Sequence, residues 1–199
     1  MKFLTFVDLH QDRKGLKELV ERARKPDIDF VICAGDISTF GAGLGMVLQQ
    51  FNQLGKKFYV IPGNHEEQAG ILDEHMVLFP WCINLHGQAM KIGNYLFLGY
   101  GGGGFTMEDA HFRKLARQWY SNYQDEKIVL VTHGPPFDTN IDVLPQGHVG
   151  NKDYRNFIER MKPKLVICGH LHETAGAVDE IGSTKIVNPG WEGMVIELK

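Results

Sequence analysis

The chain has 199 residues, of which 43% are hydrophobic and 23% are charged, and its formal net charge at pH 7 is −3. This composition is typical of a globular domain, excludes a disordered chain or a coiled coil, and argues against a sequence-independent grip on nucleic acid. The three cysteines show no paired spacing, which argues against a disulfide framework. No apolar run approaches the length of a membrane span, and residues 3–7 are too short for a signal sequence. We therefore expect one cytoplasmic domain over residues 1–199, without membrane contact.

The first half of the chain alternates short apolar runs with segments of helical periodicity. Apolar runs at 3–7, 30–33 and 58–61 predict buried strands. Hydrophobic residues recur at helical spacing within 16–23 and 44–51, which predicts a helix after each of the first two strands. Strands and helices that alternate in this way predict βαβ units and a parallel sheet.

The second half of the chain contains more strands. Three short runs within residues 82–98 are joined by glycine-containing breaks and predict a meander of short antiparallel strands. The remaining elements are expected at 112–119 and 154–161 as helices, and at 128–131, 165–168, 185–187 and 194–198 as strands. The last two of these strands are expected to be edge or antiparallel strands. So many strands in one domain require two sheets.

Polar residues that can bind a metal ion follow five of the predicted strands. The carboxyl ends of strands in an open α/β sheet face the usual ligand site, so we expect these side chains to meet in one cleft. The single-residue spacing of Asp8 and His10, and of His170 and His172, predicts that each pair points to the same side of its strand. Glycines nearby permit tight turns. The seven candidate ligands are Asp8, His10, Asp36, Asn64, His133, His170 and His172.

This mixture of ligands favours first-row divalent ions, because imidazole and carboxylate occur together. Seven ligands are too many for one tetrahedral ion but suit two ions that share a carboxylate, an arrangement used for in-line displacement at phosphorus with the ions about 3.5–4 Å apart. Two divalent ions, two aspartates and a bridging hydroxide leave a net charge of about +1, which suits a phosphate ester, whether monoester or diester. Taken alone, Asp8 and Asp36 also fit helix N-caps, and Asn64 also fits a turn.

The order of these residues resembles that of the calcineurin-like metallophosphoesterase superfamily. Its five sequence blocks correspond here to Asp-Leu-His at 8–10, Gly-Asp at 35–36, Gly-Asn-His-Glu at 63–66, His133, and Gly-His-Leu-His at 169–172. The resemblance is closest to small single-domain members. It implies an α/β fold, a four-layer α/β/β/α sandwich of two mixed β-sheets flanked by helices. Ile37-Ser38-Thr39 departs from the pattern of the protein serine/threonine phosphatases, and Gln11 stands where the superfamily often has Gly or Ser.

The resemblance also implies a role for each residue. It places three residues on a first metal ion, namely Asp8, His10 and His172. It places three on a second ion, namely Asn64, His133 and His170. Asp36 would bridge the two ions, and His65 would be the catalytic histidine that orients the phosphate or protonates the leaving alkoxide. Apart from the resemblance, we expect Glu66 or another acid to fix an imidazole tautomer. The implied ions are two of Mn, Fe, Zn or Ni, with Mn favoured.

These roles imply a phosphoesterase that hydrolyses a small phosphodiester or phosphomonoester by in-line attack of the bridging hydroxide. Two alternatives remain open: a non-catalytic metal-binding scaffold for protein interactions, and a nuclease. The basic clusters at 22–25 and 56–57 lack the interleaved aromatic residues of a nucleic-acid platform, which argues against the nuclease. No substrate-binding residue is assigned, although His148 and the glycine run at 101–104 are candidates.

Overall fold

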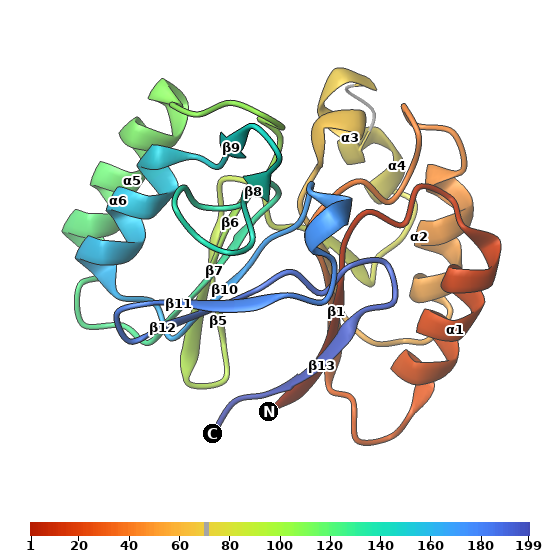
Figure 1. The fold of residues 1–199 in the computed structure, drawn as a ribbon. Helices are drawn as coiled ribbons and strands as arrows, with labels where there is room; N and C mark the ends of the chain where they lie inside the picture. Colours follow the sequence, from red (N-terminus) through yellow and green to blue (C-terminus); the bar gives the residue numbers. More distant parts are fainter. Residues whose placement is uncertain (70–71) are drawn as a thin grey trace.

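Two β-sheets lie face to face in the computed structural model of this protein, which describes residues 1–69 and 72–199 (Figure 1). The first sheet has the strand order β13-β1-β2-β3-β4, in which β1 to β4 run parallel and β13 runs antiparallel to β1. Its strands are β1 (Lys2–Phe6), β2 (Phe30–Cys33), β3 (Phe58–Val60), β4 (Cys82–Asn84) and β13 (Met194–Glu197).

The second sheet has the strand order β11-β12-β10-β7-β6-β5. Its four inner strands run parallel, and β5 and β11 are antiparallel edges. Its strands are β5 (Ala89–Ile92), β6 (Tyr95–Tyr100), β7 (Ile128–Thr132), β10 (Leu165–Ile167), β11 (Val178–Ile181) and β12 (Thr184–Val187). A separate hairpin pairs β8 (Val143–Leu144) with β9 (Gly147–His148).

Helices cover the outer face of each sheet (Figure 1). Against the first sheet pack α1 (Arg13–Arg24), α2 (Leu44–Asn52) and α4 (Leu72–Met76). Against the second pack α5 (Ala110–Asn122) and α6 (Lys152–Met161). The short helix α3 (Asn64–Ala69) and the 3₁₀ turn η1 (His172–Thr174) follow β3 and β10. No helix in the described ranges is both long and apolar enough to cross a membrane.

The alternation of side chains along β1 explains the four layers. Phe3 points between the sheets, where its ring stacks on Phe30 and meets the edge of Phe97 from the second sheet. Phe6 points to the opposite side and stacks on Phe51 of α2. Both faces of this strand are therefore buried, which is what its continuous apolar run predicts. The arrangement confirms the predicted α/β/β/α sandwich.

The helices begin at capping residues that the sequence supplies. Asp12, Asp109 and Asn151 each accept hydrogen bonds from backbone N–H groups in the first turn of α1, α5 and α6, respectively. Such a cap stabilises a helix by about 1 kcal/mol. The buried face of α1 contains the hydrophobic residues at helical spacing that predict it.

One prediction about the sheets is wrong, and a second is confirmed only in part. The runs within 82–98 do not form one meander, because β4 joins the first sheet in parallel to β3 while β5 and β6 form a hairpin in the second. The run at 185–187 was expected to be an edge or antiparallel strand. It is antiparallel to β11, but it is not an edge, because β12 lies between β10 and β11 and is parallel to β10. Local periodicity identifies a strand but does not indicate its partner.

Candidate metal centre

The loops after five parallel strands bring the predicted ligands together at one edge of the two sheets. Imidazole nitrogens and carboxylate oxygens form three overlapping groups, and within each group these atoms lie within 4.8 Å of one another. The three groups are Asp8 with His10 and His172, Asp36 with His133 and His170, and His10 with Asp36 and His65. Since the third group shares a member with each of the other two, the ligands form one continuous cluster.

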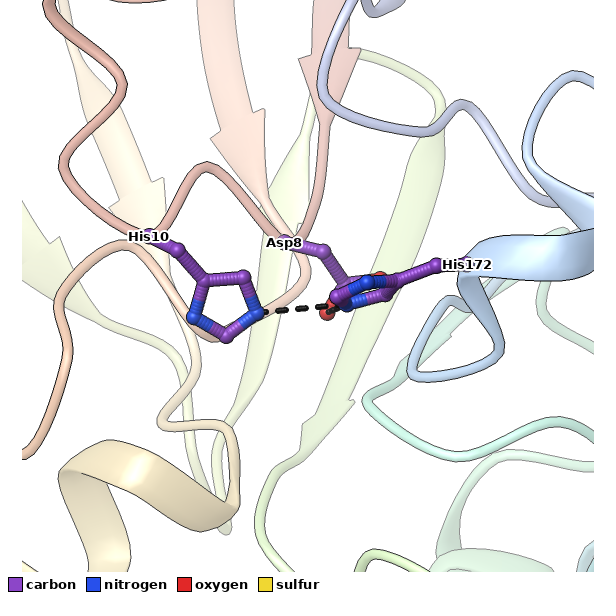
Figure 2. Close-up of side chains that lie close together, drawn as sticks. All are labelled: Asp8, His10 and His172. Atoms are coloured by element: carbon purple, nitrogen blue, oxygen red, sulfur yellow. Dashed lines mark hydrogen bonds and ion pairs between the residues drawn. The ribbon is translucent and has the colours of Figure 1, made fainter.

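Figure 2 shows the first group, in which the rings of His10 and His172 point toward each other beside Asp8. Their Nε2 atoms are 3.2 Å apart. Two nitrogens that bind one ion at about 2.1 Å each lie roughly 3.0–3.4 Å apart, so this spacing fits a shared cation. Asp8 Oδ2 accepts the backbone N–H of His170 at 2.9 Å. Its Oδ1 is buried without a hydrogen-bond partner in the described residues, as a free ligand atom would be.

In the second group, the tautomer of His133 is set by the backbone. Its Nδ1 lies 2.9 Å from the carbonyl oxygen of Ala34, which can only accept, so Nδ1 donates. The Nε2 atom then faces the cluster, 3.0 Å from Asn64 Oδ1 and 3.5 Å from Asp36 Oδ2. Asn64 therefore offers an oxygen to the same point, as predicted. A metal-binding imidazole commonly has its second nitrogen held in this way.

Asp36 lies between the groups. Its Oδ1 accepts the backbone N–H of His65 at 3.0 Å, which turns Oδ2 toward the cluster. The Oδ2 atom is 3.5 Å from His133 Nε2, 3.8 Å from His10 Nε2 and 3.9 Å from His65 Nε2. One carboxylate oxygen thus faces nitrogens from both predicted metal groups.

The electrostatics of the cluster favour a cation. Burial lowers the pKa of His170 to about 4, which keeps its imidazole neutral, and its Nε2 has no partner in the described part of the chain. Burial disfavours a charged His133, but the hydrogen bond and charge of Asp36 prevail and raise its pKa to about 9. Burial also raises the pKa of Asp8. Divalent cations would supply the positive charge that these buried carboxylates attract.

The backbone at the ligands is strained. Four candidate ligands have positive φ angles, namely Asp8 at 56°, His10 at 44°, Asp36 at 52° and His170 at 70°. Such conformations are rare for residues other than glycine and collect at functional sites. They also show that the predicted reason for the pairing was wrong. Because β1 ends at Phe6, Asp8 and His10 meet their partners through a strained loop rather than through strand alternation.

Glu66 holds the loops of this site together. Its carboxylate is 1% exposed and accepts from the backbone N–H groups of Asp36 (2.8 Å), Ser38 (2.9 Å) and Gly63 (3.0 Å), and from the Ser38 hydroxyl (2.6 Å). These four donors occupy both oxygens. The expectation that Glu66 fixes an imidazole tautomer is therefore wrong. Glu66 instead positions the backbone that carries Asp36.

Glycine is required where the loops after β2 and β3 touch. A Cβ atom at Gly63 would overlap the Oδ1 and backbone nitrogen of Asp36. A Cβ atom at Gly35 would lie 2.6 Å from the backbone nitrogen of Gly63 and 2.7 Å from His133 Nδ1. The two glycines in the Gly-Asp and Gly-Asn-His-Glu blocks thus let neighbouring ligand loops approach each other.

The remaining candidates fall in two places. His148 belongs to none of the three groups, since its Nδ1 bonds Asp142 at 2.8 Å and its Nε2 lies 3.6 Å from Asp138. The glycine run lies beside the centre, because a Cβ atom at Gly104 would be 3.4 Å from His170 Cε1. Substrate contact by this run stays a prediction.

Two aromatic residues lie beside the centre, and only one of them adjoins a predicted candidate. The ring of Phe40 stacks on His65 with centroids 4.2 Å apart, and Phe105 meets His170 edge-on at 4.3 Å. The position of Phe105 directly after the glycine run was the available signal. Nothing in the sequence marks Phe40, which lies in the loop after the Gly-Asp block.

Comparison with known proteins also indicates a metal-dependent phosphoesterase family. The family model for the calcineurin-like phosphoesterases matches residues 1–174, and the chain belongs to this family. It is 28% identical over 199 residues to the human metallophosphoesterase domain-containing protein 1, with 80% of this chain and 59% of that protein covered. It is 25% identical over 169 residues to a probable glycerophosphodiester phosphodiesterase of Arcobacter nitrofigilis, with 76% and 59% covered. The chain thus spans less than two thirds of the length of these relatives.

Solved structures support the fold. A protein from Thermus thermophilus superposes with a TM-score of 0.78 at 14% identity, covering 96% of this chain and 90% of that one. A dimetal phosphatase from Danio rerio superposes with a TM-score of 0.65 at 12% identity, covering 94% and 86%. At these identities the likeness concerns the two-sheet sandwich itself.

Proposed function

We propose that this protein is a dinuclear-metal-dependent phosphoesterase that hydrolyses a small phosphodiester or phosphomonoester. The observation that carries the proposal is the position of Asp36 Oδ2, which lies 3.5 Å from His133 Nε2 and 3.8 Å from His10 Nε2. A carboxylate oxygen between two sets of ligands is what two ions with a common ligand require. Membership of the calcineurin-like phosphoesterase family supports the same chemistry.

In this proposal, each ion has three ligands of its own. The first set is Asp8, His10 and His172, and the second is Asn64, His133 and His170. Asp36 bridges the sets. The mixture of imidazole, carboxylate and amide donors suits Mn, Fe, Zn or Ni, and the oxygen donors favour Mn. Two such ions would polarise the phosphoryl oxygens and acidify a water for in-line attack at phosphorus.

His65 is the proposed proton donor to the leaving group. Its backbone N–H is held by Asp36 Oδ1, and its ring lies edge-on to His10 with centroids 4.8 Å apart. The imidazole therefore lies against the cluster of candidate ligands. From this position it can orient the phosphate or protonate the departing alkoxide.

The substrate and setting are also proposals. The name of the Arcobacter relative supports a phosphodiester, and that of the Danio rerio structure supports a phosphatase activity. The net charge of −3 favours a small-molecule ester over a nucleic acid. We take residues 1–199 as a single metallophosphoesterase domain that acts in the cytoplasm.

The test is Mn²⁺-dependent hydrolysis of two diesters of equal charge, bis(p-nitrophenyl) phosphate and dibenzyl phosphate, by the wild type and His65→Asn. A general acid contributes about 10²–10⁴-fold to rate. Because nitrophenolate leaves without a proton, we expect the variant to lose much more activity on the dibenzyl ester. The matched control is His111→Asn, an exposed histidine in the first turn of α5, which we expect to match the wild type.

Each other outcome identifies an error. Equal losses on the two esters would contradict proton donation by His65. Loss of bound manganese in His65→Asn would make His65 a ligand, which its place in the third group of ligating atoms also allows. Binding of two ions without turnover of either ester in the wild type would refute the proposed activity and favour a non-catalytic scaffold.

A further inference from the structure

Two exposed phenylalanines lie beside the candidate centre, in loops that follow strands of different sheets. Phe40 lies between β2 and α2 and is 58% exposed, and Phe105 lies between β6 and α5 and is 59% exposed. Phe40 stacks on His65 at an interplanar angle of 28°, whereas Phe105 meets His170 at 70°. The two histidines belong to different groups of ligating atoms, so the two aromatic rings lie against different parts of the centre.

Packing does not account for Phe40. Its φ angle is 51°, a left-handed conformation that is an outlier for a bulky side chain. Ser38 holds the turn at 38–41 in place, because its hydroxyl accepts the N–H of Gly41 at 3.1 Å and donates to Glu66 at 2.6 Å. More than half of the ring nevertheless faces solvent. A strained residue that buries little of its side chain points to a role in binding.

Phe105 is held in place by the glycine run before it. The N–H of Gly102 donates to the Pro62 carbonyl at 2.8 Å, and the N–H of Gly103 donates to Glu67 Oε2 at 3.0 Å. Both glycines have positive φ angles, and a Cβ atom at Gly102 would overlap the Glu67 carboxylate. The run therefore follows the start of α3 closely and ends with the Phe105 ring against His170.

The centre thus combines a cluster of carboxylates and imidazoles with two aromatic rings beside it. The ligand cluster would hold the phosphate, which leaves the organic part of an ester beside the exposed rings. Aromatic rings favour stacked or edge-to-face contact with another planar ring, a preference beyond apolar burial alone. A flexible polyol would gain nothing comparable from these two side chains.

We propose that Phe40 and Phe105 bind a planar ring in the organic part of the substrate, so that this site prefers phosphate esters of alcohols that carry an aromatic or heterocyclic ring. This inference rests on the proposed phosphoesterase function and specifies its substrate class.

The test is equilibrium binding, by calorimetry, of two probes that are not hydrolysed, benzylphosphonate and cyclohexylmethylphosphonate, to the Mn²⁺-loaded protein. The probes share their charge and their number of carbon atoms, but only the first has a planar ring. Each aromatic contact corresponds to about a two- to tenfold change in affinity. We expect the wild type to prefer benzylphosphonate, and Phe40→Leu and Phe105→Leu each to reduce that preference two- to tenfold.

The matched control is Trp81→Leu. Trp81 is 39% exposed but precedes β4, at the amino end of the parallel strands and so opposite the edge that carries the centre. We expect this variant to keep the wild-type preference.

Equal affinity of the wild type for the two probes, or no detectable binding of either, would overturn the inference. So would a benzyl preference that survives in both leucine variants. If Phe40→Leu weakened both probes equally, Phe40 would only position His65. Ester hydrolysis is measured on the same preparations, so absent turnover with a retained benzyl preference refutes the proposed function alone. Normal turnover without the preference refutes the aromatic contact alone.

Discussion

Replacing Glu66 by glutamine tests whether this buried carboxylate holds the ligand loops in place. The substitution keeps the shape of the side chain but turns one acceptor oxygen into an NH₂ group, which then faces two backbone or hydroxyl donors. Glu66 accepts from four donors that belong to Asp36, Ser38 and Gly63. Two of the four bonds are lost, and each bond to a charged group contributes roughly 1.5–3 kcal/mol. We expect Glu66→Gln to lower the free energy of unfolding by about 3–6 kcal/mol.

The assay is urea unfolding of the metal-free protein, with Glu67→Gln as the matched control. Glu67 is exposed and, among the residues that the structure describes, accepts one bond, from the N–H of Gly103 at 3.0 Å. We expect the control to lose less than about 1 kcal/mol, because exposed bonds exchange readily with water. If Glu66→Gln unfolded at the wild-type urea concentration, or if both variants lost the same stability, the network assigned to Glu66 would be refuted.

Three further perturbations have defined outcomes. Gly63→Ala forces a Cβ atom onto Asp36 and should lower the free energy of unfolding in urea by at least about 1–3 kcal/mol. The control, Gly45→Ala, lies inside α2 with its nearest neighbour 3.5 Å away and should raise the free energy of unfolding by about 0.5–1 kcal/mol. The reverse order of stability would contradict the contact between Gly63 and Asp36. Burial raises the pKa of Cys82 to about 12, so Cys82 in the native protein should resist alkylation by iodoacetamide at pH 8 until urea unfolds the chain. Rapid alkylation of native Cys82, detected by mass spectrometry, would contradict its burial. Mn²⁺ at 100-fold above its dissociation constant should raise Tm by about 5–10 °C per site and EDTA should reverse the rise; an unchanged Tm would show that the folded protein binds no ion.

The fold was predictable where the evidence is local. The apolar runs and helical spacing of the first half identify β1 to β3, α1 and α2, because a buried strand or helix face must be hydrophobic along its own length. The assignment of β4 to the first sheet was not predictable in this way. Its partner, β3, is separated from it by α3 and α4, and pairing over such a distance leaves no mark in the periodicity of either strand.

The clustering of the candidate ligands was predictable because they sit at strand ends in recognisable blocks. Their order indicates the partners, and the structure brings all of them to one place. What supports them was not predictable. A backbone carbonyl at Ala34 orients His133, and backbone N–H groups occupy Glu66, yet main-chain groups are the same at every position and so carry no sequence signal. The left-handed conformation of Phe40 was not predictable either, because phenylalanine disfavours that conformation.

The most direct test of the account is the number and position of metal ions in crystals of the protein grown with Mn²⁺, located by anomalous diffraction. The account predicts two peaks about 3.5–4 Å apart, with the Asp36 carboxylate between them. One ion should contact Asp8, His10 and His172, and the other Asn64, His133 and His170. A single peak, or two peaks of which one lies beyond reach of Asp36, would contradict the dinuclear centre.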